Sequence, residues 1–308
     1  MANGYEALRR GAAWLDVSDR GRLLARGRDR ARFLHNVTSN EVKKLAPGSG
    51  CYAFLLTPQG RIQADVNLFC FSDHFLLDTE PELREKVPAL ILRYKVADQV
   101  EIEDVTAATS ALALEGPAAA AALAAAKAPV PGEPCAHLPW GEAVVAGVSL
   151  TGQPGFRIFA PAAAKSDLIR LLEAAGAHPA TLADARLVRI ENGKPRYGED
   201  IRETSLPQET QQMQAVSFQK GCYLGQEIVE RIRAQGHVNK KLVRLALDSA
   251  QPVEPGTRLS ADGKEAGEVT SSAYSPDARG VAALAYVRTP YANPGSVLQA
   301  GEISARVL

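Results

Sequence analysis

The residues best suited to chemistry lie in the run Lys220-Gly221-Cys222-Tyr223-Leu224-Gly225-Gln226-Glu227. The two glycines let the backbone take conformations closed to other residues or approach a ligand closely. Lys220 stands two residues before Cys222, and a predicted helix begins just after the loop. A nearby ammonium and a helix N-terminus both favour a thiolate over a thiol. The run therefore predicts a reactive cysteine, the alternative being the small buried core residue that a free cysteine usually is.

A second candidate run extends from Arg189 to Asp200, with the sequence Arg-Ile-Glu-Asn-Gly-Lys-Pro-Arg-Tyr-Gly-Glu-Asp. Glu191 falls in the last turn of a predicted helix, where the helix dipole opposes a negative charge by about 0.3–1 kcal/mol. A carboxylate in an unfavourable place suggests a function. The alternative is a simple salt bridge with Arg189 or Lys194.

A third candidate is Asp65, in a predicted strand of alternating character. Ile62, Ala64, Val66, Leu68 and Cys70 fall on one face, so Cys70 is expected in the core. Asp65 lies between two amides on the other face, which could be a ligand wall or ordinary surface. Because half-buried strands commonly have one solvated face, the pattern alone favours solvent.

The run at 220–227 resembles the K-G-C-Y-x-G-Q-E signature of the YgfZ-like folate-binding proteins, relatives of the glycine-cleavage T-protein (aminomethyltransferase) implicated in iron–sulfur enzyme maturation. The run at 189–200 resembles the R-x-E-x-G-x-x-x-x-G-x-D run of that superfamily, whose glutamate bonds the pterin ring. The resemblance implies that Glu191 contacts tetrahydrofolate, or a one-carbon derivative, with Arg189 beside it. Tyr223 would either stack on a ligand or fill a core corner.

The predicted hairpin at Gly60–Asp65 resembles the superfamily's G-x-x-x-D-D element, which supplies a catalytic aspartate near folate N5. Only the second carboxylate, Asp65, is kept, because Ala64 replaces the first. The resemblance covers essentially the whole chain. It implies an α+β fold with three subdomains around a central folate site, the last being a β-barrel.

The leading interpretation is a tetrahydrofolate-binding protein that assists assembly or repair of iron–sulfur enzymes through transient contacts. Asp65 and Glu191 would hold folate, and Cys222, activated by Lys220, would act in a thiol or one-carbon step. The runner-up is a folate-dependent aminomethyltransferase or demethylase, which the missing acid at Ala64 disfavours. A third interpretation is a module that only carries folate, with Cys222 structural.

The pattern of elements predicts an α+β body of two subdomains over residues 1–236 and a small β-barrel over 237–308. In the body, helices are expected at 5–15, 30–37, 81–95, 118–127, 161–176, 181–192 and 226–235, with Thr38-Ser39-Asn40-Glu41 capping another turn. In the barrel, strands are expected at 242–247, 258–261, 264–271, 281–287 and 297–308. Asp262-Gly263 has the type I′ hairpin signature.

Composition sets limits on partners and compartment. Thirty-five basic and thirty-five acidic residues give no net charge, so no overall field attracts nucleic acid or a membrane surface. Alternating arginines from Arg20 to Arg32 are expected on a solvated face. Four scattered cysteines indicate a reducing compartment, and the histidines form no metal-ligand spacing, so no stable metal cluster is expected. Met1–Arg10 has no apolar signal segment, so a cytoplasmic location is expected.

Overall fold

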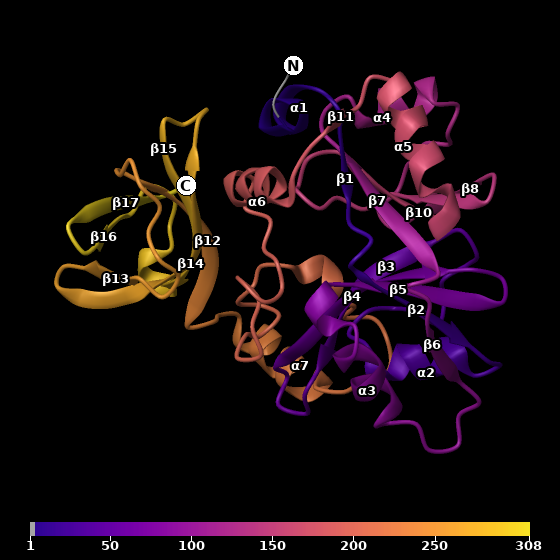
Figure 1. Cartoon of the computed structure of the whole chain (residues 1–308). Coiled ribbons are helices and arrows are strands. Elements are labelled where there is room, and N and C mark those ends of the chain that lie inside the picture. The colour runs from indigo at the N-terminus through magenta and orange to yellow at the C-terminus, as the bar shows by residue number, and fades with distance from the viewer. Residues whose placement is uncertain (1–3) are drawn as a thin grey trace.

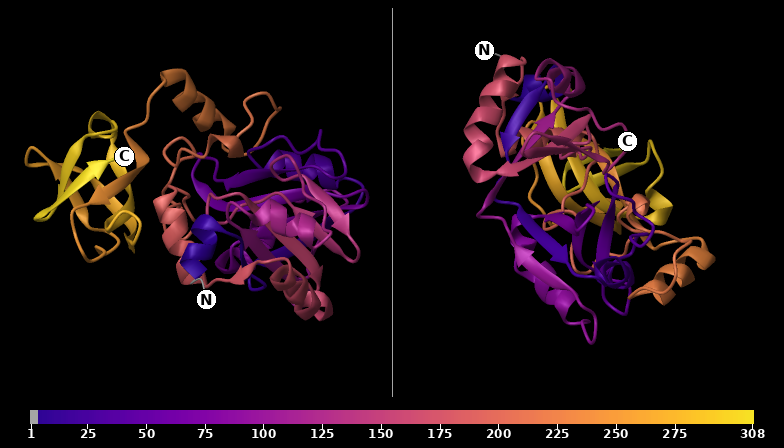
Figure 2. Two further views of the ribbon diagram at one scale, coloured as in Figure 1. Left: turned by 90° about the horizontal axis from the view of Figure 1, so that it is seen from above. Right: turned by 90° about the vertical axis from the view of Figure 1, so that its right-hand side faces the viewer.

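The computed structural model describes residues 4–308, which form a body with two sheets and a separate barrel (Figure 1). The predicted α+β architecture, with a C-terminal β-barrel as its last part, is confirmed. Figure 2 shows the barrel to one side of the body. Across residues 4–308, every helix is too short or too polar to cross a lipid bilayer. The prediction for Met1–Arg10 falls partly on residues 1–3, outside the described residues.

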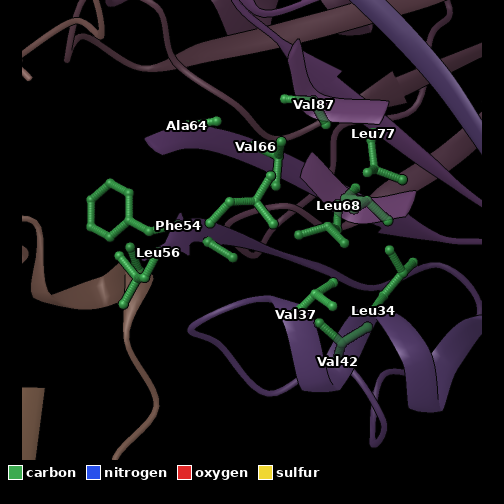
Figure 3. Packing of buried hydrophobic residues seen from close by; sticks show 14 of the residues in the cluster. Leu34, Val37, Val42, Phe54, Leu56, Ala64, Val66, Leu68, Leu77 and Val87 are labelled. Atoms are coloured by element: carbon green, nitrogen blue, oxygen red, sulfur yellow. The ribbon is translucent and has the colours of Figure 1, made fainter. Parts of the chain in front are cut away.

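The first sheet is antiparallel, with strand order β3-β4-β5-β2-β6. Its strands are β2 (Gly21–Arg26), β3 (Gly50–Leu56), β4 (Ile62–Cys70), β5 (His74–Thr79) and β6 (Glu101–Asp104). Three helices share its apolar core, namely α2 (Arg30–Val37), α3 (Lys86–Leu92) and α7 (Gln226–Gln235). As the alternation predicts, every second residue of β4 from Ile62 to Cys70 is buried in that core. Figure 3 shows part of this packing, with Ala64, Val66 and Leu68 among its members.

The second sheet has the order β11-β1-β7-β10-β9-β8, and only the short β1–β11 pair is parallel. Its strands are β1 (Ala13–Asp16), β7 (Thr109–Glu115), β8 (His137–Trp140), β9 (Ala143–Ala146), β10 (Gly155–Pro161) and β11 (His178–Pro179). Helices α1 (Gly4–Arg10) and α6 (Leu182–Glu191) share one core with it, and α4 (Ala119–Ala125) and α5 (Lys165–Ala174) share another. Phe69 and Leu76 of the first sheet join the α1/α6 core. The two sheets therefore pack face to face, which is where a site between them can form.

The barrel closes in the order β12-β15-β14-β13-β16-β17. Its strands are β12 (Lys240–Leu247), β13 (Arg258–Ala261), β14 (Lys264–Ser275), β15 (Gly280–Arg288), β16 (Val297–Ala300) and β17 (Ile303–Val307). Asp262 and Gly263 both have positive φ, of 50° and 73°, as the predicted type I′ turn requires. Short 3₁₀ turns elsewhere are Pro81–Leu83, Ala162–Ala164, Met213–Ala215 and Thr289–Tyr291.

Polar side chains join the barrel to the body at Asp200, which is fully buried. Its Oδ1 atom accepts hydrogen bonds from the hydroxyls of Thr270, at 2.6 Å, and Ser271, at 2.7 Å, both on β14. Its Oδ2 atom accepts from Arg189 Nη1 at 2.7 Å. A buried carboxylate is thus satisfied jointly by the body and the barrel.

Three predictions about local structure are wrong. The helix expected over 5–15 ends at Arg10, and β1 follows, because Ala13 and Leu15 are buried in a period-2 pattern while β1 pairs with β7. The segment 38–41 starts no helix, since its hydroxyls bond to carbonyls of distant loops and of α2 instead of capping a new turn. The strand expected over 297–308 is a hairpin, β16 and β17.

Candidate functional site

A cavity of about 270 Å³ lies where the two sheets of the body meet the segment after α6. The side chains of β3, β4 and β5 form one wall, and β10 with the 147–150 loop forms another. Twelve of the nineteen lining residues have charged or polar side chains. They are Arg20, Tyr52, Asp65, Asn67, Asp78, Glu80, Ser149, Arg157, Arg189, Lys194, Arg196 and Gln214.

Asp65 points into this cavity from the polar face of β4, so the solvent interpretation favoured by the strand pattern is wrong. Its Oδ2 atom accepts a hydrogen bond from the Tyr52 hydroxyl at 2.7 Å. Its Oδ1 atom is buried and has no hydrogen-bond partner in residues 4–308. Burial, reinforced by the negative charge of Glu80, raises the pKa of Asp65 to about 6. A buried oxygen without a partner is costly, so a donor from outside the described chain, such as a ligand or a water molecule, is expected there.

Ala64, the neighbour of Asp65, lies on the opposite face of β4 and is fully buried in the apolar core of the first sheet (Figure 3). Successive side chains of a strand point to opposite faces. A carboxylate at position 64 would therefore enter that core and not the cavity. The replacement of an acid by Ala64 leaves the cavity itself unchanged.

A network of buried ion pairs supports the floor of the cavity. Arg20 Nε and Nη2 donate to the two oxygens of Asp78 at 2.9 and 3.0 Å, and Arg20 also bonds to Glu80. Arg196 pairs with Glu80 at 3.1 Å. Burial alone would raise the pKa of Asp78, but the Arg20 guanidinium, with Arg157, holds that pKa below its ordinary value.

Two members of the arginine run that was expected on a solvated face are buried. Arg20 is 6% exposed, and Arg22 is 1% exposed and donates to the carbonyls of Ser18, Arg20, Thr106 and Thr109. The prediction is wrong for these two, because carbonyls and carboxylates from other segments satisfy their charges. Asp78 was missed as well. A charged residue inside the apolar strand Phe75–Thr79 was the available signal.

Arg189 and Glu191 lie on different sides of α6. Arg189 lines the cavity and is held by Asp200 and Glu199, each at 2.7 Å. The Glu191 carboxylate does not line it. It accepts hydrogen bonds from the Tyr5 hydroxyl at 2.9 Å and the Ser275 hydroxyl at 2.5 Å, and Arg9 lies 3.5 Å away. The predicted ligand contact of Glu191 has no support in this geometry, because the carboxylate is used between α1, α6 and the barrel.

The structure separates Cys222 from the cavity. Cys222 is exposed and lines a surface groove beside α2, with Asn36 and Tyr94. Asp65 and Cys222, predicted as parts of one catalytic set, are thus in two different places. Tyr223 is 7% exposed and packs in the core of the first sheet, and it lines the Cys222 groove but no part of the Asp65 cavity.

Lys220 is buried beneath α2, and its ammonium is directed at the main chain. It donates to the carbonyls of His35, of Thr38 at 2.6 Å and of Asn40 at 2.9 Å. Burial lowers the pKa of Lys220 to about 8. The ammonium thus anchors the loop that carries Cys222, and no contact joins it to the thiol in residues 4–308, contrary to the predicted activation.

Limiting iodoacetamide at neutral pH is expected to alkylate Cys222 before the other three cysteines. Cys222 alone among them is exposed in the described chain. Burial raises the pKa of Cys51 to about 12 and of Cys135 to about 11, and it also raises that of Cys70. Because the thiolate is the reactive form, these three should react slowly. Cys135, which could have been exposed by its loop position, is 7% exposed.

Peptide mass spectrometry after brief labelling measures the order of alkylation. The same reaction in denaturant, where all four thiols are free, is the control. Faster labelling of Cys51 or Cys135 in the folded protein would contradict the burial described above.

Comparisons with known proteins place the chain in a family. Residues 1–220 match the model of the GCVT N-terminal domain, and residues 240–307 match the glycine cleavage T-protein C-terminal barrel domain. The chain is 33% identical to the aminomethyltransferase of Rubrobacter xylanophilus, over 92% of this chain and 78% of that protein. It is 29% identical to a putative chloroplastic transferase of Arabidopsis thaliana, over 96% of this chain and 70% of that protein.

The crystal structure of the glycine cleavage system aminomethyltransferase T from Bartonella henselae has the same fold. Its TM-score is 0.89, at 23% identity, over 99% of this chain and 87% of that one. Both parts of the chain thus match the two domains of a single kind of protein, in the same order. The chain belongs to the glycine-cleavage T-protein family.

Proposed function

We propose that this protein binds tetrahydrofolate in the Asp65 cavity, with the carboxylate accepting an N–H of the bound ligand. One observation carries the proposal, namely the buried Oδ1 atom of Asp65, which faces the cavity without a partner. Proteins of this family use tetrahydrofolate, whose reduced pterin offers several N–H donors. An ionised carboxylate makes stronger hydrogen bonds than a neutral acceptor.

The residues present fit such a ligand. An adjoining cavity of about 250 Å³ lies beside the first, and the two share the lining residues Arg20, Glu80, Leu150, Arg189 and Arg196. Tyr52 donates to one oxygen of Asp65 and fixes its orientation. Bound tetrahydrofolate would supply a carrier nitrogen for a one-carbon unit. The protein itself would orient the bound ligand through Asp65, and the cavity would shield most of the ligand from water.

We further propose a YgfZ-like role, in which the folate-loaded protein supports iron–sulfur enzymes. The exposed Cys222, in its loop between Gly221 and Gly225, supports this role, because it is accessible to a partner protein. The distance in the fold between this thiol and the cavity argues for two sites with separate tasks. Cys222 would meet the client transiently, and Asp65 would hold the folate. A cytoplasmic location remains a prediction.

An aminomethyltransferase is the second candidate, and one observation favours it. Residue 64 points away from the cavity, so its lack of a carboxylate removes no group from the site. Several relatives are also named aminomethyltransferases. The assay that separates the candidates is glycine-dependent formation of methylenetetrahydrofolate with purified partner proteins, run beside iron–sulfur enzyme activities in a deletion strain.

In that comparison the YgfZ-like role predicts no appreciable methylenetetrahydrofolate and restored iron–sulfur enzyme activity. It also predicts that Cys222→Ser folds normally but fails to restore that activity. Turnover within tenfold of an authentic T-protein, a barrier difference of only about 1.4 kcal/mol, would establish the second candidate instead. Full restoration by Cys222→Ser would leave Cys222 without a role in the function.

Asp65→Asn is expected to weaken tetrahydrofolate binding by about 1.5–3 kcal/mol, the range for a lost hydrogen bond to a charged group. The carboxylate must be ionised to act as a pure acceptor. The affinity of the wild type for tetrahydrofolate should therefore also decrease at pH values below about 6, the pKa of Asp65. Anaerobic calorimetry at several pH values measures both effects. Asp167→Asn, an exposed carboxylate on α5, is the matched control. Equal affinities for wild type and folded Asp65→Asn would refute the folate site.

A further inference from the structure

Arg157 is a buried guanidinium that the protein leaves without hydrogen bonds. It lies on β10, is 1% exposed and lines the Asp65 cavity. Its Nε and Nη1 atoms are buried without a partner, and none of its nitrogens donates to any group in residues 4–308. A guanidinium has five N–H donors, and buried donors of a charged group are expensive to leave unused. Something outside the described chain is needed to satisfy them.

Three carboxylates that attract Arg157 are already occupied, and Glu80 is the one paired with both Arg20 and Arg196. Asp78 Oδ1 lies 3.8 Å from Arg157 Nη1, too far for a hydrogen bond, and its oxygens accept from Arg20 and Asn67. Glu115 is fully buried and accepts four hydrogen bonds from the 149–151 loop. None of the three can turn to Arg157 without losing stronger partners.

A second cation without a hydrogen-bonded counter-charge lines the same cavity. Lys194 Nζ makes no ion pair or hydrogen bond within residues 4–308, and it lies 5.9 Å from the centroid of the Tyr52 ring. Of the carboxylates that line the cavity, Asp78 and Glu80 are paired, and only Asp65 is without a cation in the described chain. No ion pair joins Lys194 to Asp65 in the described chain, although the charge of Lys194 acts to lower the pKa of Asp65. Arg157 and Lys194 therefore both lack a hydrogen-bonded counter-charge within residues 4–308.

We propose that Arg157 receives a carboxylate of the bound ligand, with Lys194 adding a second positive charge nearby. The planar fork of a guanidinium matches the two oxygens of a carboxylate. The proposal rests on the proposed function in that the ligand includes a folate. Two sources of the carboxylate are possible, the glutamyl part of that folate or a separate small carboxylic acid bound beside it. Both require the same recognition by Arg157.

The experiment compares Arg157→Met with wild type, using tetrahydrofolate, 6-methyltetrahydropterin, which has no carboxylate, and acetate. If the folate supplies the carboxylate, wild type prefers tetrahydrofolate over the pterin at least tenfold, and Arg157→Met loses most of that preference. If a separate acid supplies the carboxylate, wild type and Arg157→Met each bind tetrahydrofolate and 6-methyltetrahydropterin with equal affinity. Acetate then protects only wild type against thermal unfolding. Arg170→Met removes an exposed arginine of α5 and serves as the charge control.

Thermal unfolding without ligand provides a second, independent measurement. If Arg157 serves a ligand, removing an unsatisfied buried charge should leave the midpoint unchanged or raise it. A fall of several degrees would mean that the long pair with Asp78 is structural, and it would overturn the proposal. Unchanged ligand preference together with unchanged acetate protection would overturn it too. If wild type binds no folate at all, the proposed function fails, and the acetate measurement still decides the role of Arg157.

Discussion

Asp78→Ala is expected to lower the free energy of unfolding by about 3–5 kcal/mol, the usual loss when one partner of a buried ion pair is removed. Asp78 is fully buried and accepts hydrogen bonds from Arg20 Nε and Nη2 with its two oxygens, and Arg157 lies 3.8 Å away. Without it Arg20 loses one of its two carboxylate partners, and Arg157 loses its ion-pair partner. Because Glu80 still bonds to Arg20, the loss should stop short of complete unfolding.

Urea denaturation at pH 7 measures this loss. Asp73→Ala is the matched control, since Asp73 is an exposed partner of Arg26 on the same hairpin and should cost less than about 1 kcal/mol. A loss of under 1 kcal/mol for Asp78→Ala would show that the network contributes little to stability. The tightly paired floor of the cavity would then need another explanation.

Asp65→Asn is expected to make the ligand-free protein more stable above neutral pH, by about 2–3 kcal/mol at pH 8. The pKa of Asp65 is about 6 in the folded state and near 3.8 when unfolded. The folded state therefore binds the proton more tightly than the unfolded state does. The contribution of Asp65 to the free energy of unfolding has its full value below about pH 4. It is lost as pH rises through 6, because a tenfold difference in proton affinity between the two states corresponds to about 1.4 kcal/mol. Asparagine cannot ionise and avoids the loss.

Unfolding curves of wild type and Asp65→Asn between pH 4 and 8 test this expectation. The difference between the two proteins in free energy of unfolding should be small at pH 4, increase up to about pH 7 and then stay constant. Asp167→Asn, which removes an exposed carboxylate on α5, is the control for the loss of one negative charge. A constant difference at every pH would mean that Asp65 is not held in the costly ionised form. The same variant is expected to bind tetrahydrofolate more weakly, as is common when a binding site trades stability for function.

Local patterns in the sequence predicted much of the fold. The alternation along β4 and the Asp262-Gly263 turn depend on neighbours in the chain, so their spacing alone specifies them. The helix over 5–15 failed because a short apolar run fits both periods, and pairing with β7 decided between them.

The site was predicted only in part. Asp65 was identified as a candidate. Whether it faces solvent or a cavity depends on the second sheet, whose residues are far away in sequence. Glu191 was singled out because its place at a helix end looked unfavourable, and the resemblance of the 189–200 run assigned it to the ligand. Tyr5 and Ser275, distant in the chain, supply the hydrogen bonds that stabilise it there. Arg157 could not be singled out, because only the missing partners in three dimensions distinguish it.

The sharing of Asp200 between the body and the barrel limits how this chain can be dissected in the laboratory. A fragment ending near residue 236 would keep Arg189 on the cavity wall but would lack Thr270 and Ser271, which bond to the other oxygen of Asp200. Such a fragment would present an altered cavity wall, although the barrel itself contributes no lining residue. Ligand titrations on the excised body would therefore report on a different binding site from that of the intact chain.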